Sequence, residues 1–276
     1  MPLPSAIRAI ADASASRIVG AYFELSYRLL SAPAGREFLR AAAVGDAPAV
    51  HGYSTSEDVE AVLDAIQPSA TDLLLDLGCG LGEVAIAVHR RTGCRVVGID
   101  AAPDAIAEAR RRAVEAGAGA AAAVRFHVGD LASPPVRGSG AYALDSLMFV
   151  PRPPQAIASV SRSLEPPGRI FVTFVDHRGL GRAAFARYIE AGGVRVERLE
   201  DVSSEFARRS RERAATARRL LRGGPSWTGR LGLRLVLVEE AIAGRLLARG
   251  RLRRWRFIVA WNPYRPAPGT TSRRRA

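Results

Sequence analysis

This chain of 276 residues contains no lysine, and its 40 strongly basic residues are all arginine. Catalysis through a lysine Schiff base or carbamate is therefore excluded. Cysteine is scarce as well, since the sequence holds only Cys79 and Cys94. Cys79 lies in a glycine-rich turn and Cys94 just before a predicted strand, toward opposite edges of one sheet. We expect neither a disulfide nor a metal site from them, and we expect a reducing, cytoplasmic compartment.

Long apolar runs are also missing. No stretch reaches about eighteen uncharged apolar residues, so no membrane span is expected. The N-terminus lacks a basic leader followed by an apolar segment, so no signal peptide is expected. With 48% hydrophobic residues, the chain can bury one large core and a small accessory unit.

Charge is distributed unevenly along the chain. Residues 1–150 hold 13 arginines and 17 acids, a net charge of −4, whereas residues 151–276 hold 27 arginines and 10 acids, a net charge of +17. Such a surplus indicates an anionic partner, either a small substrate or a nucleic acid. Arginines that are merely solvated at the surface are the alternative.

The most informative stretch is Leu73–Val88, which reads LLLDLGCGLGEVAIAV. Its apolar run Leu73–Leu77 predicts a buried strand of a parallel sheet, and a helical pattern begins at Glu83. Between them stand three alternating glycines: Gly78, Gly80 and Gly82. A strand that turns through glycines into a helix is expected to leave backbone N–H groups directed at a ligand site. Asp76 precedes the turn, at the sheet edge where open α/β sheets bind ligands.

Two further predicted strands end in carboxylates. Arg95–Ile99 is followed by Asp100, 24 residues after Asp76, at the spacing of an acid that binds ribose hydroxyls. Val124–Val128 is followed by Gly129 and Asp130. Three successive strand ends thus deliver a carboxylate to one edge of one sheet.

This arrangement resembles the class I S-adenosylmethionine-dependent methyltransferases of the small-molecule, natural-product type, over about residues 50–175 and more loosely to the C-terminus. The resemblance implies an α/β fold, a Rossmann-like, seven-stranded, mostly parallel sheet with helices on both faces. It also implies S-adenosyl-L-methionine as cofactor. The residues that it assigns to the cofactor are Asp76, Gly78, Cys79, Gly80, Asp100, Ala101, Asp130, Leu131 and Tyr53.

Within that resemblance each part of the cofactor has its own residues. The turn around Gly78 and Gly80 would hold the methionine part, and Tyr53 would lie near it. Asp100 would take the ribose hydroxyls. Asp130 would contact the adenine amino group, with Leu131 beside the ring.

A nicotinamide cofactor is the rival reading, because those enzymes also use a glycine turn and a ribose-binding acid. Their G-x-G-x-x-G pattern would require glycine at position 83, where this chain has Glu83. A carboxylate there would repel a pyrophosphate but suits a sulfonium ligand with an amino group. The sequence therefore favours the methyltransferase-type site.

We expect five segments along the chain. Residues 1–50 form a helical cap broken at Pro33, Gly35, Gly45 and Pro48, which either walls the substrate pocket or only covers the sheet. Residues 51–202 form the Rossmann-like core, with a small-residue connector at Gly117–Ala123. Residues 203–250 form a helical lid insertion, 251–264 the last strand, and 265–276 a disordered tail.

Candidates for catalysis are less clear. Many relatives carry a histidine where Met148 or Phe149 stands, so a histidine base at that point is absent. Asp145 could face the transferred methyl group or tie its loop. His177, at the end of a predicted strand, is the best-placed proton acceptor, and His51 is the second.

The predicted lid carries two notable patterns. In its second helix, one stripe predicts core packing rather than membrane contact; it consists of Leu231, Leu235, Val238, Ile242 and Leu246. In its first helix, arginines form a cluster that could hold an anionic small substrate with a phosphate, diphosphate or carboxylate, such as a prenyl diphosphate. That cluster consists of Arg208, Arg209, Arg211, Arg213, Arg218, Arg219 and Arg222.

The leading functional hypothesis is methyl transfer to an oxygen, nitrogen or carbon atom of a small molecule in specialised metabolism. A nucleic-acid methyltransferase is the first alternative, although no N/D-P-P-Y motif follows the fourth predicted strand. A methyltransferase-like fold that binds the cofactor without transferring methyl is the second. A homodimer is compatible with the sequence.

Overall fold

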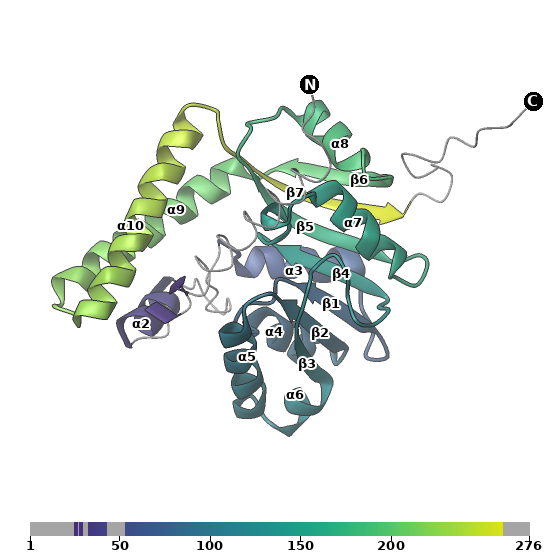
Figure 1. Cartoon of the computed structure of the whole chain (residues 1–276), viewed down its shortest axis with the longest axis horizontal. Coiled ribbons are helices and arrows are strands. Elements are labelled where there is room, and N and C mark those ends of the chain that lie inside the picture. Colours follow the sequence, from purple (N-terminus) through teal and green to yellow (C-terminus); the bar gives the residue numbers. More distant parts are fainter. Residues whose placement is uncertain (1–24, 27, 30–32, 43–52, 262–276) are drawn as a thin grey trace, which may run out of the picture.

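The computed structural model describes residues 25, 26, 28, 29, 33–42 and 53–261. Seven strands form one sheet in the order β3-β2-β1-β4-β5-β7-β6, with β7 antiparallel to its neighbours and the other pairs parallel (Figure 1). The strands are β1 (Leu73–Leu77), β2 (Arg95–Asp100), β3 (Val124–Val128), β4 (Gly140–Leu144), β5 (Arg169–Asp176), β6 (Val194–Asp201) and β7 (Arg253–Trp261). The predicted Rossmann-like, seven-stranded, mostly parallel sheet is confirmed.

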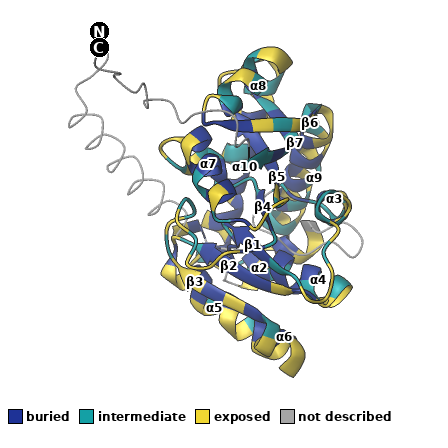
Figure 2. Ribbon diagram, turned by 90° about the vertical axis from the view of Figure 1, so that its right-hand side faces the viewer, coloured by how far each residue is buried: buried dark blue, intermediate teal, exposed yellow. Residues whose placement is uncertain are grey.

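Helices cover both faces of this sheet. They are α2 (Pro33–Ala42), α3 (Ser56–Ile66), α4 (Glu83–Thr92), α5 (Pro103–Glu115), α6 (Ala118–Ala123), α7 (Pro153–Arg162), α8 (Arg182–Glu190), α9 (Ser203–Arg222) and α10 (Trp227–Ala248). Side chains alternate along a strand, so Leu74 packs with α3, α4 and α5 on one face, while Leu75 packs with α7 and α8 on the other. Figure 2 shows the strands as mostly buried between partly exposed helices.

Two local expectations about helices are wrong. Pro33 begins α2, because proline fits the first turn of a helix, where its missing N–H needs no partner, but the predicted break at Gly35 is wrong. Gly35 lies inside that helix. The stretch Gly117–Ala123 is not a plain connector, since Ala118–Ala123 forms the short helix α6. Alanine has the strongest helix propensity, and six small residues suffice for one and a half turns.

Helices α9 and α10 form a hairpin between β6 and β7, and α2 packs against it. Phe38 of α2 is fully buried in a cluster with Ala217 of α9 and Leu233 of α10. The same cluster contains Leu81 and Ala102, which follow β1 and β2. Helix α2 therefore joins the hairpin to the edge of the sheet where the glycine turn lies.

The prediction that the apolar stripe of α10 packs into the core is wrong for three of its five members, whereas Leu235 and Leu246 are half-buried. Leu231, Val238 and Ile242 are 48%, 56% and 52% exposed. The opposite face is buried because its glycines permit a close helix contact. A Cβ on Gly229 would lie 2.6 Å from the Cβ of Ala34, and one on Gly232 would lie 3.3 Å from the Cβ of Leu29.

Within the described part of the chain, no helix is both long and apolar enough to cross a bilayer.

Truncating Phe38 tests the docking of α2. Phe38→Ala should lower the free energy of unfolding by about 3–5 kcal/mol, because it removes a fully buried ring and leaves a cavity. Val114→Ala, at a residue 69% exposed, should change it by less than about 0.5 kcal/mol. Urea denaturation measures both, and an equal loss in the two variants would contradict the packing of α2.

Candidate functional site

The glycine turn after β1 is held together mainly by its own backbone. Gly78, Gly80 and Gly82 have φ of 82°, 52° and 82°, a region that favours glycine. The N–H groups of Gly78 and Cys79 donate to the carbonyl of Ile99, at 2.7 and 3.1 Å, and that of Gly82 donates to Cys79. The expectation that the turn leaves these N–H groups free for a ligand is therefore wrong. The first two fasten the turn to β2 instead, and the third closes the turn on itself.

Glycine is required at position 78 because the side chains of Ser146 and Leu131 lie close to its Cα. A Cβ there would meet the Cβ of Ser146 at 2.2 Å and Cδ2 of Leu131 at 3.4 Å. Leu131 comes from the loop after β3, so the structure brings this predicted residue to the turn. Ser146 follows β4, and its hydroxyl donates to the carbonyl of Leu77. No sequence signal had pointed to Ser146.

Asp100 holds its carboxylate in a fixed orientation at the end of β2. Oδ2 accepts the Gly80 N–H at 2.9 Å and Oδ1 accepts the Ala102 N–H at 2.9 Å. Burial raises the pKa of Asp100, and these backbone donors partly oppose that rise. An ionised carboxylate can accept roughly four hydrogen bonds, so two N–H groups leave capacity on the two oxygens for hydroxyl donors.

Asp76 is buried at the end of β1, and burial raises its pKa to about 8. Its Oδ2 has no hydrogen-bond partner among the described residues. Buried polar atoms are nearly always satisfied, so an orphaned carboxyl oxygen beside the glycine turn fits a ligand that brings a donor such as an amino group.

Asp130 and Ala101 lie at the exposed rim of the same edge. Oδ1 of Asp130 accepts the Ala132 N–H at 2.9 Å, which fixes the start of the loop after β3. The Gly129 N–H donates to the carbonyl of Asp100 at 2.9 Å, so the ends of β2 and β3 are joined. The structure thus gathers the predicted residues of three strand ends along one edge.

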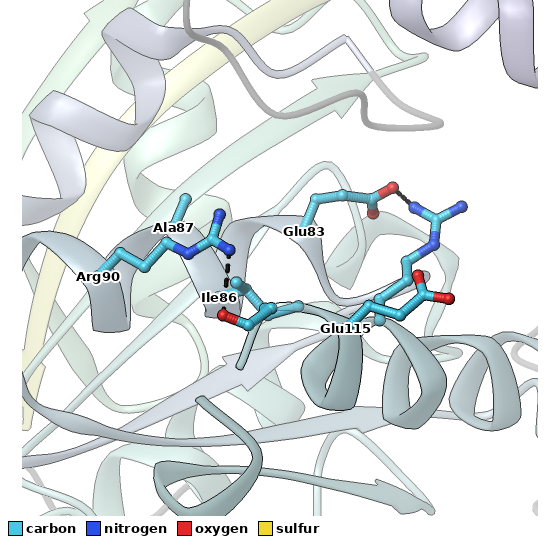
Figure 3. A pocket seen from close by; sticks show the side chains of 7 residues that line it. Glu83, Ile86, Ala87, Arg90 and Glu115 are labelled. Carbon is cyan, nitrogen blue, oxygen red and sulfur yellow. Dashed lines mark hydrogen bonds and ion pairs between the residues drawn. The ribbon is translucent and has the colours of Figure 1, made fainter. Parts of the chain in front are cut away.

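Glu83 takes no part in that edge. Its carboxylate forms an ion pair with Arg112 in a groove between α4 and α5 (Figure 3). Arg112 also pairs with Glu108 at 2.7 Å. The groove therefore carries charges that neutralise each other. The expectation that the Glu83 carboxylate suits a sulfonium ligand is not supported, because this carboxylate pairs with Arg112 away from the glycine turn.

A cavity of about 330 Å³ lies between the ends of β4 and β5 and the hairpin of α9 and α10. Its lining is mostly apolar. The apolar side chains are Tyr53, Met148, Phe149, Val175, Phe206, Ile242, Ala243, Leu246 and Leu252. Four ionisable residues join them: Asp145, His177, Arg213 and Glu239.

Asp145 ties its loop to the last strand. Both of its oxygens accept from Arg254 of β7, at 3.1 Å from Nε and 2.9 Å from Nη2. Arg254 is 1% exposed and also donates to Asp58 of α3 at 2.9 Å. Burial alone would raise the pKa of Asp58, but Arg254 and Arg256 lower it below its usual range. Of the two roles considered for Asp145, the structural one matches these contacts.

Tyr53 and Arg213 meet at a buried carboxylate. The Tyr53 hydroxyl donates to Glu240 Oε2 at 3.1 Å, and Arg213 Nε donates to Oε1 at 2.7 Å. The guanidinium of Arg213 lies 5.0 Å from the centre of the Tyr53 ring and 5.1 Å from that of Phe38. These contacts fasten α9, α10, α2 and the segment before α3 to one another.

Of the other arginines in the predicted cluster, one is buried and the rest are exposed. Arg209 is buried like Arg213, and its Nε and Nη1 have no hydrogen-bond partner among the described residues. The exposed members are Arg208, Arg211, Arg218, Arg219 and Arg222. The face formed by 211, 218 and 222 therefore points to solvent.

Two cavity residues could move a proton. His177 follows β5, and burial lowers its pKa, with Asp176 acting in the opposite sense. Glu239 of α10 has its pKa raised to about 7 by burial and by the neighbouring Glu240. The sequence prediction had missed Glu239, although two adjacent acids in the apolar run LVLVEEAIA are a usable signal. His51, the second predicted base, lies outside the described residues.

No group of three or more His, Cys, Asp or Glu side chains suited to a metal ion occurs in residues that the structure describes. Cys79 and Cys94 are both buried free thiols.

Comparison with known proteins identifies the domain that carries this edge. Residues 74–168 match the family described as "Methyltransferase domain". These residues are therefore similar to a methyltransferase domain. The resemblance to the class I S-adenosylmethionine-dependent methyltransferases is confirmed at this level.

Two curated relatives each match about a third of the chain. One is a 23S rRNA (uracil(1939)-C(5))-methyltransferase of Methylococcus capsulatus, 39% identical over 83 residues, which are 30% of this chain and 18% of that protein. The other is a ubiquinone biosynthesis O-methyltransferase of Xylella fastidiosa, 31% identical over 103 residues, or 37% of this chain and 42% of that protein. The chain thus spans less than half the length of either relative.

Solved structures share the fold over more of the chain. The [4+2]-cyclase SpnF superimposes with a TM-score of 0.70 at 21% identity, covering 89% of this chain and 96% of that chain. A geranyl diphosphate C-methyltransferase from Streptomyces coelicolor A3(2), in complex with Mg²⁺, geranyl diphosphate and S-adenosyl-L-homocysteine, gives a TM-score of 0.60 at 17% identity, covering 75% and 79%. At such identities the likeness is one of fold.

Removing Asp145 tests its structural role. Asp145→Ala should lower the free energy of unfolding by about 3 kcal/mol, because Arg254 would remain buried with one carboxylate fewer. Asp201→Ala is the matched control, since Asp201 also pairs with an arginine of β7, Arg253 at 2.6 Å, but at an exposed position. It should cost at most about 1 kcal/mol. Equal losses in chemical denaturation would contradict the assignment.

Proposed function

We propose that the chain is an S-adenosylmethionine-dependent methyltransferase whose acceptor is a small, largely apolar molecule. The observation that carries the proposal is the Asp100 carboxylate, oriented by Gly80 and Ala102 beside the orphaned carboxyl of Asp76. The methyltransferase domain match covers both residues. The mostly apolar cavity lies at the same edge of the sheet and supplies a place for the acceptor.

The residues present fit this cofactor. Asp100 would bind the ribose hydroxyls with its remaining lone pairs, and Asp76 would receive the amino group of the methionine part. Asp130 and Leu131 would lie beside the adenine, and Tyr53, Cys79 and Ala101 stay predicted members of the set. When bound, the cofactor would supply an electrophilic methyl group on a sulfonium.

The protein's own contribution to the reaction is alignment and proton removal. The acceptor atom forms a bond to the methyl carbon as the sulfur–carbon bond breaks, so the reaction depends on holding the acceptor in line and excluding water. The apolar cavity walls serve both needs. An acceptor that carries a proton on its nucleophilic atom would pass it to His177, whose lowered pKa keeps the imidazole neutral near pH 7.

The lining favours an apolar acceptor over an anionic one. Arg213, the arginine that lines the cavity, already pairs with Glu240, and both Glu239 and Asp145 would disfavour a phosphate. An anionic acceptor such as a prenyl diphosphate would instead need Arg209, whose buried Nε and Nη1 are without partners in the described structure. The fold shared with a geranyl diphosphate C-methyltransferase supports this second candidate, an anionic acceptor.

Two other functions are weaker candidates. The rRNA methyltransferase relative supports a nucleic-acid substrate, but its similarity covers only 83 residues, which are 18% of that protein. The likeness to a [4+2]-cyclase supports a fold that does not transfer methyl. A role in specialised metabolism, a cytoplasmic location and a homodimer stay predictions.

Asp100→Ala tests the cofactor site. Loss of the hydrogen bonds to an ionised acceptor should weaken S-adenosylmethionine binding by about 1.5–3 kcal/mol, which is tenfold or more in Kd. Asp104→Ala is the control, because Asp104 lies four residues away but pairs with Arg28 at an exposed position. Isothermal titration calorimetry measures both. An unchanged Kd for Asp100→Ala, in a variant that unfolds at the parent temperature, would contradict the ribose assignment.

The pH dependence of turnover separates the two proton acceptors. If His177 is the base, the rate should fall only at a pH lower than the ordinary imidazole pKa, because burial lowers the pKa of His177 and protonation removes its acceptor lone pair. Glu239 would place this fall at about pH 7. His177→Gln should reduce kcat by about 10²-fold or more and abolish the acid limb, whereas Glu239→Gln should keep it. The reverse pattern would assign the role to Glu239.

A further inference from the structure

The outer face of α10 carries apolar side chains that no other helix or strand of the described residues covers. Trp227, Leu231, Val238 and Ile242 are 76%, 48%, 56% and 52% exposed. Their spacings of four, seven and four residues place them on one face of the helix. Figure 1 shows α10 along the outer margin of the molecule, with α9 between it and the sheet. We name these four residues the α10 stripe.

Exposed arginines accompany the α10 stripe. Residues 203–250 hold 11 arginines and 4 glutamates, a net charge of +7. On the outward face of α10 they alternate with the apolar residues: Arg230, Arg234, Arg245 and Arg249 are all exposed. On α9, Arg211, Arg218, Arg219 and Arg222 are exposed and form no ion pair with a described residue. By contrast, exposed arginines of α5 and β6, such as Arg111 and Arg198, pair with glutamates at short range.

The α10 stripe also leads into the cavity. Ile242 belongs to the stripe and lines the cavity at the same time, and Phe149, which is 39% exposed and lies outside the stripe, lines the cavity as well. Leu246, one turn beyond Ile242, continues the apolar surface inward. A continuous apolar path therefore runs from the exposed face of α10 to the inside of the cavity.

We propose that the α10 stripe and its flanking arginines dock the protein onto the surface of an anionic lipid bilayer. An amphipathic helix with a tryptophan and aliphatic residues on one face, interleaved with arginines, binds in the interfacial plane, its apolar groups inserted and its cations near lipid phosphates. Arginine stems reach outward past the apolar residues, so both groups can contact the bilayer at once. The α10 face has this composition along its whole length.

A protein partner matches these observations less well. A helix that packs on protein through an apolar stripe usually keeps cations out of the stripe's centre, because burying an unpaired guanidinium is costly. Here Arg234 and Arg245 fall between the apolar residues on the same face. At a bilayer surface the same guanidinium groups meet phosphates and remain hydrated. Docking would also place the cavity mouth against the lipid, which suits an apolar substrate.

Vesicle binding tests this docking without relying on catalysis, so its outcome is independent of the proposed function. The full chain is sedimented with phosphatidylcholine vesicles that contain phosphatidylserine, and with phosphatidylcholine vesicles alone. We expect binding to the first and weaker, salt-insensitive binding to the second. Tryptophan emission should shift to shorter wavelength on binding, and Trp227→Ser should remove most of that shift.

Matched variants separate the apolar and charged contributions. Leu231→Ser with Val238→Ser should weaken binding about tenfold or more, while Val114→Ser with Val136→Ser, also at exposed positions, should leave it unchanged. Arg234→Gln with Arg245→Gln should weaken binding to the anionic vesicles by about fivefold per charge, and Arg95→Gln with Arg125→Gln should not.

Three outcomes would overturn the proposal. The first is no binding of the parent chain to either vesicle. The second is binding that depends on the arginines but not on the α10 stripe, which would indicate a soluble polyanion. The third is self-association in analytical ultracentrifugation that Leu231→Ser with Val238→Ser abolishes, in a chain that ignores vesicles; the stripe would then bind a second copy.

Discussion

The site depends on the ion pairs of one buried guanidinium, that of Arg254. Arg254 arrives on the last strand, after the hairpin, and is held by Asp145 at the end of β4 and by Asp58 of α3. A charge buried at 1% exposure is tolerated only when it is paired, so these three elements must meet. Asp145 is followed by Ser146, which packs on Gly78 and donates to Leu77. A single loop thus joins the wall of the cavity to the glycine turn.

This coupling explains why the cofactor edge and the cavity lie side by side although they come from different parts of the chain. Strands β1, β2 and β3 supply the three carboxylates, and β4, β5 and the hairpin supply the cavity. The polar groups of the two regions also differ in their environments. Asp100 is fixed by backbone donors, whereas His177 and Glu239 have pKa values displaced in opposite directions by burial in an apolar surrounding. Such a division suits binding at one region and proton movement at the other.

The sequence predicted correctly the features that depend on neighbouring residues alone. The strand Leu73–Leu77, the glycine turn and the acid after β2 follow from apolar runs, backbone freedom and spacing. What failed depends on distant partners. The partner of Asp145 lies 109 residues away, and no periodicity identifies it. The buried face of α10 is set by Gly229 against Ala34 of α2 and by Gly232 against Leu29, so the richer apolar face stays outside. The N–H groups of Gly78 and Cys79 donate to the carbonyl of Ile99, and the pattern of a ligand-binding glycine loop does not predict this.

The central claim is that a sulfonium cofactor bound at the edge formed by β1, β2 and β3 presents its methyl group to the apolar cavity. A crystal structure with S-adenosyl-L-homocysteine tests this most directly. The account predicts both ribose hydroxyls within hydrogen-bonding distance of the Asp100 oxygens, the amino group near Asp76, and the sulfur facing the cavity beside His177. A product molecule bound elsewhere, or one whose sulfur faces away from the cavity, would contradict it.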